Sequence, residues 1–381
     1  MKTYLVGGAV RDQLLDLAVA ERDWVVIGST PDEMLAAGFR RADTEFPVFL
    51  HPETGEEYAL ARTEVKTAIG YKGFQVDYGP HITLEQDLLR RDLTINAMAM
   101  TESGELIDIC GGRDDLDSGM LRHITHAFTE DPVRLLRIAR FAAKLGCWGF
   151  RVAHATHALM KKMALSDDLM SLNAERIWRE MKRAFSTPQP WRFFEVLHRC
   201  GALQRLLPEL AEGMTSAGHG EATGGEFIGP LKRVVKESED PVVRCGVALF
   251  DTVLRLAQPD EWMRQLRIEK ASRQLLNDLL RFHRLSSNLE QTEQILRFVV
   301  TLNPRQQPLR FHHFVAASLG LWPQRVKGLL PGLQYSVELL GSPIPEDLID
   351  SGLEGQALGE ALFAWRVVRL EEVMRQTRGS N

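Results

Sequence analysis

Short apolar runs alternate with polar turns over the first third of the chain. Runs with the period of a strand predict strands at 2–6, 23–27, 46–50, 58–62, 95–100 and 106–109. Helical periodicity lies between them at 11–17, 31–37 and 84–91, and the glycine-containing turns at 52–55 and 101–104 are typical of hairpins. This spacing does not suit a series of βαβ crossovers. We therefore expect a small α/β head with a mixed or antiparallel sheet.

The pattern changes near residue 125, after which no strand is predicted. Apolar residues recur with a period near 3.6 at 131–145, 153–164, 173–185 and 191–200, which predicts helices. Six glycines within 211–230 indicate a linker or mobile loop, and helical segments then continue to about 376. The predicted fold class is α+β, with a head at 1–125, a helical neck at 126–210, the linker at 211–230, and a helical body and tail at 231–381.

Composition and charge narrow the class of protein. A chain of 381 residues, 44% hydrophobic, is long enough for two domains and a core that needs no disulfide. Four scattered cysteines form no C-x-x-C pair, which predicts reduced thiols. Arg11 and Asp12 interrupt the N-terminal apolar run, which argues against a signal peptide, and no run reaches the ~18 apolar residues of a membrane span. We expect no membrane contact and a cytoplasmic location.

The charges are unevenly distributed along the chain. Residues 1–125 hold 12 Lys and Arg against 22 Asp and Glu, whereas residues 126–206 hold 14 against 7. An acidic region followed by a basic one suits a metal-dependent site beside a surface that binds a polyanion. An ordinary solvated helix face explains the same charges equally well.

A glycine turn followed by two carboxylates is the strongest candidate site. Gly7 and Gly8 end the first predicted strand, Arg11 follows in a helix, and Glu21 and Asp23 lead into the apolar run 24–27. Side chains at i and i+2 of a strand share a face, so both carboxylates can point to one place. Two carboxylates beside a turn that admits a phosphate predict a site for Mg²⁺ and a nucleotide.

Two other segments combine cationic or acidic residues with turns. Arg90 and Arg91 end a helical run and can bind phosphates through their guanidinium groups, although pairing with Asp87 or Asp92 would make them structural. Residues 108–116 combine a strand end, a Gly-Gly turn and an acidic helix start, which favours a structural turn between head and neck.

The predicted helix at 131–145 carries a polar row. Asp131, Arg134 and Arg137 are spaced i, i+3 and i+6, and Arg140 continues the row. The opposite side is expected to be buried: Leu135, Leu136, Ile138 and Ala139. Because Asp and Arg together supply acceptors and donors, the row suits the edge of a nucleobase. A surface ion pair between Asp131 and Arg134 is the alternative.

In this order and spacing, the four segments resemble the bacterial class II tRNA nucleotidyltransferases, the CCA-adding enzymes, which share their head domain with bacterial poly(A) polymerases. The resemblance is dense over residues 1–185, includes the neck-helix motif at 173–180, and fades beyond the glycine-rich segment. It implies a polymerase-β-like nucleotidyltransferase head followed by an all-helical neck, body and tail. It also implies addition of CCA to the tRNA 3′ end without a nucleic-acid template, from CTP and ATP, by a two-metal Mg²⁺ reaction that releases pyrophosphate.

The resemblance assigns roles to residues of the head. Gly8 and Arg11 are expected to contact the triphosphate, Glu21 and Asp23 to hold the catalytic Mg²⁺, and Arg91 to bind the nucleotide. The first metal carboxylate of the family is usually Asp, and Glu21 is longer by one methylene. Mg²⁺ tolerates little deviation from octahedral geometry, but Glu still coordinates metal, so we expect activity to remain.

The resemblance also assigns roles to the neck. Asp131 and Arg134 match the amino-acid template that pairs with C or A, and Arg137 and Arg140 match further nucleotide contacts. Segments 62–67 and 70–74 resemble the family's flexible loop, which is associated with the switch from C to A addition. Their presence argues against an enzyme that adds only CC.

The C-terminal half departs from many relatives, which carry a His-Asp phosphohydrolase domain there. Where the pair is expected the chain reads Leu-Phe-Asp-Thr at 249–252, and the histidines of this half show no metal-ligand spacing. We therefore expect no phosphohydrolase activity and a body that is structural or binds tRNA.

The expected partner is the acceptor stem and 3′ end of tRNA, bound by a monomer or weak homodimer. The alternatives are a poly(A) polymerase or A-adding enzyme, and a catalytically impaired tRNA-binding protein.

Overall fold

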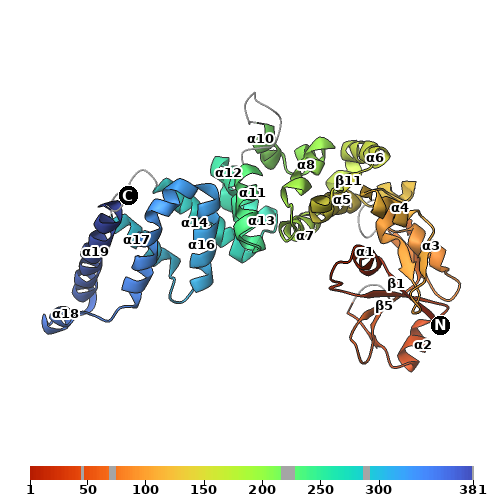
Figure 1. Ribbon diagram of the computed structural model, residues 1–381, viewed down its shortest axis with the longest axis horizontal. Helices are drawn as coiled ribbons and strands as arrows, with labels where there is room; N and C mark the ends of the chain where they lie inside the picture. Colours follow the sequence, from red (N-terminus) through yellow and green to blue (C-terminus); the bar gives the residue numbers. More distant parts are fainter. Residues whose placement is uncertain (44–46, 68–73, 216–227, 286–291, 380–381) are drawn as a thin grey trace. The chain divides into compact units, whose positions relative to one another are not determined.

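The computed structural model describes residues 1–43, 47–67, 74–215, 228–285 and 292–379. The chain divides into two compact units, Met1–Pro208 and Glu209–Asn381, called here the N-terminal and C-terminal units (Figure 1). The predicted head and all but the last two residues of the predicted neck lie in the N-terminal unit, so the predicted boundary between them at residue 125 stays a prediction.

Seven strands of the N-terminal unit form one sheet in the order β3-β4-β5-β2-β1-β8-β9. Their bounds are β1 Lys2–Val6, β2 Asp23–Ile27, β3 Arg40–Arg41, β4 Val48–Leu50, β5 Glu57–Leu60, β8 Met98–Met100 and β9 Leu106–Asp108. Neighbouring strands are antiparallel except β2 and β5, which run parallel. The predicted mixed sheet is confirmed.

Each face of the sheet has its own core, because successive residues of a strand point to opposite faces. Val25 of β2 belongs to a cluster with Leu88 of α3 (Leu84–Leu89), whereas Val26 belongs to a cluster with Met34 of α2 (Pro31–Ala36). Figure 1 shows these two helices beside the strands. Both helices begin with a capping box, in which the N-cap threonine and the third helical residue satisfy each other's backbone N–H groups.

Two predicted strands include residues that belong to other elements. The first part of 95–100 is a 3₁₀ turn, Thr94–Asn96, because Asn96 turns its amide inward to Arg11 and Asp92. The strand predicted at 58–62 ends at Leu60, and Arg62–Lys66 forms β6, which pairs with β7 (Phe74–Tyr78) in a separate antiparallel ribbon.

The ribbon covers part of the predicted flexible loop. Residues 62–66 of that loop form the strand β6, so the prediction of a loop is wrong there, and 68–73 lie outside the described residues. The ammonium of Lys66 lies 2.8 Å from the carboxylate of Asp168, so the ribbon contacts the helical part of this unit. Pairing with β7 and this ion pair fix the conformation that the sequence pattern did not reveal.

The helices after the sheet are α5 Val133–Leu145, α6 His154–Leu165, α7 Ala174–Phe185, α8 Trp191–Arg199 and α9 Ala202–Leu206. Helix α5 packs against α7 and α8, and its predicted apolar side is buried. The neck is not all-helical as predicted, because β11 (Arg151–Val152) pairs in parallel with β10 (Met120–Leu121). Gly149, with φ of 83°, turns the chain so that the N–H of Arg151 donates to the carbonyl of Gly119.

Every regular element in the described residues of the C-terminal unit is a helix. Its helices are α10 Pro208–Thr215, which starts at the unit boundary, α11 Ile228–Glu237, α12 Pro241–Arg255, α13 Pro259–Gln265, α14 Lys270–Arg284, α15 Thr292–Leu302, α16 Pro308–Leu321, α17 Pro323–Gly341, α18 Glu346–Asp350 and α19 Gly355–Gly379. None of the helices in the described ranges combines the length and apolarity that a membrane span requires.

The linker predicted at 211–230 is wrong at both ends. Helix α10 extends to residue 215 and α11 begins at residue 228, because the buried side chains of Ala211 and Ile228 give these ends apolar contacts. Residues 216–227 of the predicted linker lie outside the described residues.

Residues 108–116 form the structural turn that the sequence predicts. The carboxylate of Asp108 accepts backbone N–H groups from Cys110, Gly112 and Arg113 at the start of α4 (Gly112–Asp117). A Cβ at Gly112 would overlap the carbonyl oxygen of Thr94 and lie 2.9 Å from Met98 Cγ. Only glycine lets α4 approach the backbone so closely.

Gly112→Ala is expected to lower the free energy of unfolding by roughly 1–3 kcal/mol, because the added methyl group meets backbone that cannot move aside. Thermal denaturation of the full chain measures this as a lower Tm. The matched control is Gly359→Ala in α19, where no atom lies within 4 Å of the new Cβ, and its Tm is expected to stay unchanged or rise. Equal Tm values for Gly112→Ala and the parent would contradict the close approach.

Candidate active site

One cavity of about 800 Å³ in the N-terminal unit is lined by all nine site residues predicted from the sequence. These residues come from four places: the turn after β1 and helix α1 (Gly8–Leu14), the start of β2 and the residues before it, the segment just after α3, and α5 with the extended residue that precedes Pro132. They are Gly8, Arg11, Glu21, Asp23, Arg91, Asp131, Arg134, Arg137 and Arg140. The fold therefore brings together residues that are up to 132 positions apart, although lining a cavity does not by itself assign a role to any of them.

Glu21 and Asp23 face this cavity from unequal positions. Asp23 is the first residue of β2, whose bounds match the predicted strand 23–27, whereas Glu21 precedes the strand. The shared face of side chains at i and i+2 of one strand therefore does not apply to this pair. The reason is that β1 ends at Val6, the partner of Asp23, and β5 begins at Glu57 at the same level. Glu21 therefore has no strand partner on either side.

The two carboxylates fit a divalent cation. In the described part of the chain, neither forms an ion pair or a side-chain hydrogen bond, and both are exposed to the cavity. The surrounding protein partly excludes water from the Asp23 carboxyl, and this loss of hydration raises its pKa above the ordinary value. The positive charge of Arg91 opposes the rise, and the negative charge of Glu21 adds to it. Two unpaired carboxylates close enough to repel are the oxygen ligands that Mg²⁺ prefers, and Mg²⁺ commonly takes its other ligands from water and phosphate.

The glycine turn places two arginines at the cavity. Gly7 has φ of 70° and is the N-cap of α1, and a Cβ there would lie 3.0 Å from Arg91 Nη1. Arg11 is only 3% exposed, and it donates to Asp12 and Asn96. Its guanidinium lies 5.2 Å from the centre of the Phe141 ring. Glycine at position 7 is thus required by the backbone and by the close approach of Arg91.

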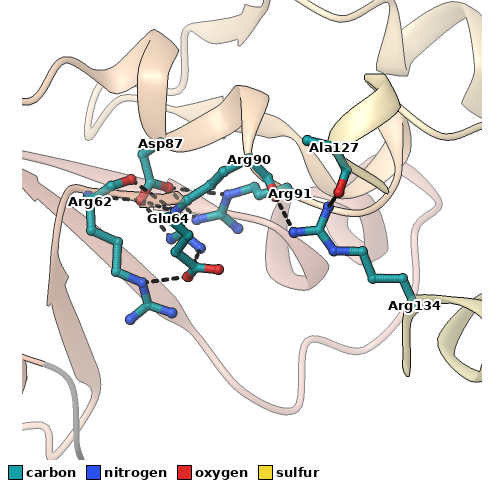
Figure 2. A network of polar contacts seen from close by, with 7 residues as sticks. All are labelled: Arg62, Glu64, Asp87, Arg90, Arg91, Ala127 and Arg134. Atoms are coloured by element: carbon teal, nitrogen blue, oxygen red, sulfur yellow. Dashed lines mark hydrogen bonds and ion pairs between the residues drawn. The ribbon is translucent and has the colours of Figure 1, made fainter. Parts of the chain in front are cut away.

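Arg90 and Arg91 both pair with Asp87, so the structural pairing considered from the sequence is present (Figure 2). Their distances to the Asp87 oxygens are 2.6 and 2.9 Å. Both arginines also line the cavity. Structural pairing and exposure to a ligand are therefore compatible at these two positions. The other candidate partner, Asp92, is instead bound by Arg137 at 2.6 Å.

The polar row of α5 does not form the surface ion pair considered as its alternative. Asp131 accepts from the backbone N–H of Val133 and from Arg176 at 2.8 Å, rather than from Arg134. Arg134 donates to the carbonyl oxygens of Ala127 and Arg90. Both members of the predicted pair therefore have fixed positions and different partners.

The remaining arginines of the row are held from behind. Arg140 lies 2.6 Å from Glu180 of α7, which is 4% exposed. The guanidinium groups of Arg137 and Arg140 also lie 5.9 and 4.5 Å from the centre of the Phe141 ring. At these distances the face of the ring attracts the positive charge. Counting all lining residues, ten side chains are cationic and six are acidic. The cavity suits a ligand with several negative charges.

Sequence reasoning missed several residues of the cavity. Asp92, Asn96, Lys144, Arg176 and Arg183 also line it. Helical spacing gives a signal for some of them, because Lys144 is one turn beyond Arg140 and Arg183 is two turns beyond Arg176. Asp92 and Asn96 lie inside the segment that begins with the arginine pair, but their inward direction depends on the 3₁₀ turn.

Comparisons with known proteins agree with this site. Residues 3–122 match the family model of the poly(A) polymerase head domain, and residues 149–214 match the model described as a probable RNA and SrmB-binding site of polymerase A. The class of protein is therefore a nucleotidyltransferase with this type of head.

Curated relatives define the family more narrowly. The multifunctional CCA protein of Thioalkalivibrio sulfidiphilus is 42% identical, with 100% of both chains covered. The CCA-adding enzyme of Pseudomonas entomophila is 41% identical over 97% of this chain and 99% of that one. The chain belongs to the family of CCA-adding tRNA nucleotidyltransferases.

Solved structures show the same fold. A tRNA-processing enzyme with CTP has a TM-score of 0.67 at 21% identity, covering 97% of this chain and 96% of that one. The Thermotoga maritima CCA-adding enzyme complexed with tRNA has a TM-score of 0.67 at 20% identity, covering 100% and 91%. The predicted fold class, a nucleotidyltransferase head followed by a mainly helical region, is confirmed.

Asp92 gives the site a pH-dependent contribution to stability. Burial alone would raise the pKa of Asp92, but the charge and hydrogen bond of Arg137 lower it to about 2. A carboxyl with a lowered pKa stabilises the fold above its unfolded pKa of about 4, and this contribution is lost as the pH falls towards 2. Asp92→Asn is therefore expected to lower the free energy of unfolding by roughly 2 kcal/mol at pH 7.

The difference in the free energy of unfolding between the parent and Asp92→Asn is expected to narrow by about 1 kcal/mol as the pH falls from 5 to 3. Urea denaturation of the two proteins at both pH values measures it. The control is Asp117→Asn, which removes an exposed ion pair with Arg113 and should show little cost at either pH. A gap that stays constant or widens on acidification would contradict the assigned pairing.

Proposed function

We propose that this protein adds CCA to the 3′ end of tRNA from CTP and ATP, and so matures and repairs tRNA. The supporting observation is the single cavity that combines an unpaired carboxylate pair with a wall of fixed arginines. Family membership over the whole chain supports the same reaction, because relatives named for CCA addition align with both units. This alignment over the whole chain favours CCA addition, whereas the head domain alone would equally allow poly(A) polymerase activity.

Glu21 and Asp23 are proposed to hold Mg²⁺ at the start of β2. When bound there, the ion would neutralise charge on the reacting phosphate and lower the pKa of the attacking 3′-hydroxyl. Arg91 and Arg11 would hold the triphosphate, and the glycine turn at Gly8 would let the backbone approach it. The contribution of these residues is positioning and charge neutralisation, which supply most of the catalysis in phosphoryl transfer.

Asp131 and Arg134 are proposed to select the base. Arg134 has five N–H groups and uses only two of them on carbonyl oxygens, so three remain for a nucleobase. Asp131 is oriented by Val133 and Arg176, and each of its oxygens keeps a lone pair. Arg137 and Arg140 are proposed as additional nucleotide contacts.

The tRNA is proposed to bind through its backbone and A-form shape along the basic neck and the helical C-terminal unit. One chain supplies all of the proposed site residues, so a monomer is sufficient for the reaction. We place this reaction in the cytoplasm, where tRNA is matured in bacteria.

Replacing Asp23 by Ala is expected to abolish incorporation of labelled CMP and AMP into tRNA that lacks its 3′ end, because one metal-binding oxygen pair is lost. Glu21→Asp keeps a carboxylate and is expected to retain activity, and Asp117→Asn serves as the control for a distant carboxylate. Sequencing of the products should show C, C and A and then termination. Unchanged incorporation by Asp23→Ala, or long A tails from the parent, would contradict the proposal.

Arg134→Ala is expected to blur the choice among CTP, ATP, GTP and UTP, because the donors that would read the base are removed. The measurement is the ratio of kcat/KM for correct and incorrect nucleotides on one tRNA substrate. A loss of about tenfold corresponds to one hydrogen bond to the base. If discrimination stays as sharp as in the parent, Arg134 does not select the base.

A further inference from the structure

We infer that Asp87 is a positioning residue that fixes two nucleotide-facing arginines at once, Arg91 directly and Arg134 through Arg90, with Glu64 supporting the second arm. The inference rests on the proposed function, in which Arg91 binds the nucleotide and Arg134 selects the base. It assigns roles to two residues that do not belong to the proposed set of nucleotide contacts.

Asp87 cannot itself contact a ligand in the cavity. Its side chain is 0% exposed, and it does not line the cavity. One of its oxygens accepts from the backbone N–H of Arg62 and from Arg90, and the other accepts from Arg91. Figure 2 shows the guanidinium groups of Arg90 and Arg91 gathered beside this carboxylate. Asp87 therefore acts on the cavity only through the arginines.

The first arm is a direct ion pair. Arg91 donates from Nε and Nη2 to one oxygen of Asp87, at 3.3 and 2.9 Å. Its third nitrogen, Nη1, is the atom that a Cβ at Gly7 would approach. The guanidinium is thus held between Asp87 and the glycine turn, with two of its nitrogens donating to the same carboxylate oxygen.

The second arm passes through the main chain of Arg90. The side chain of Arg90 donates to Asp87, to Glu64 at 2.9 Å, and to the carbonyl of Arg62 at 3.0 Å. Its own carbonyl oxygen accepts from Arg134 Nη2 at 2.8 Å. The residue whose side chain is held by Asp87, Glu64 and Arg62 thus also supplies one of the two carbonyls that orient Arg134.

The charge arrangement explains why a buried carboxylate is placed here. A buried charge is costly unless it is paired and hydrogen-bonded, and a buried ion pair is often no more stabilising than apolar packing. What the ion pair adds is a unique geometry for two adjacent guanidinium groups that would otherwise repel each other. The positions of these two guanidinium groups determine where their N–H donors face the cavity.

The two arms predict different effects for two variants. Glu64→Gln weakens the Arg90 arm and the ion pair that Glu64 also makes with Arg62 at 3.0 Å. It leaves the bonds between Asp87 and Arg91 intact. Discrimination among the four nucleotides is therefore expected to fall about fivefold or more while the KM for CTP stays within about twofold. Asp87→Asn weakens both arms, so the KM for CTP is expected to rise about tenfold and discrimination to fall as well. Asp117→Asn, which removes an exposed ion pair in the same unit, should change neither.

Discrimination is a ratio of kcat/KM values measured on one preparation, so it does not depend on the fraction of protein that is folded. Glu64 is partly exposed, so Glu64→Gln keeps the test valid even where Asp87→Asn fails to fold. In the background of Arg134→Ala, Glu64→Gln should cause no further loss of discrimination, because the two residues act in series.

Equal loss of rate for all four nucleotides in Glu64→Gln would indicate a purely structural role and overturn the inference. An additive loss in the double variant would overturn the route through Arg134. If Arg134→Ala blurs the choice of nucleotide but Glu64→Gln does not, this inference fails alone and the proposed function stands. If Arg134→Ala leaves the choice sharp, the proposed base selection fails and this arm fails with it.

Discussion

Buried carboxylates in and behind the cavity wall hold its arginines in place, and the site depends on this constraint. Ten cationic side chains line one cavity, and like charges this close repel one another. Asp92 binds Arg137 and Glu180 binds Arg140, each at 2.6 Å and each with its carboxylate buried. Because the carboxylate takes only some of the five N–H groups of an arginine, the others remain available at the cavity. The ion pairs thus orient the arginines without using all of their donors.

In contrast to the paired arginines, the two carboxylates at the start of β2, Glu21 and Asp23, have no bound cationic partner among the described residues, and Glu21 contributes to the raised pKa of Asp23. The same cavity therefore contains arginines that are neutralised from behind and carboxylates that are not. A ligand with a cation near its reactive phosphate and several further negative charges would complement both halves, which is the charge pattern of a metal-bound nucleoside triphosphate.

Local patterns in the sequence predicted the parts of the site that are local in the fold. The glycine turn, the adjacent arginines and the arginines of the row at 131–140 each lie within a short segment, so spacing alone locates them. Asp131 itself precedes α5 in an extended conformation, so the helix predicted to begin there starts two residues later. The partners behind the arginines were not predictable in the same way. Arg137 meets Asp92 across 45 residues and Arg140 meets Glu180 across 40. These pairs depend on how α5 packs against the sheet and against α7, which no local pattern specifies.

Glu21 is longer by one methylene than the Asp that the family usually carries here, and its position before β2 is relevant to this difference. On a regular strand, an extra methylene would move the carboxylate away from the point at which Asp23 is aimed. Glu21 instead precedes β2, where the chain has no strand partner to fix its distance from the cavity. It still lines the cavity, and its charge is felt by Asp23. Both carboxylates therefore face one cavity although Glu21 lies outside the strand and is longer than Asp by one methylene.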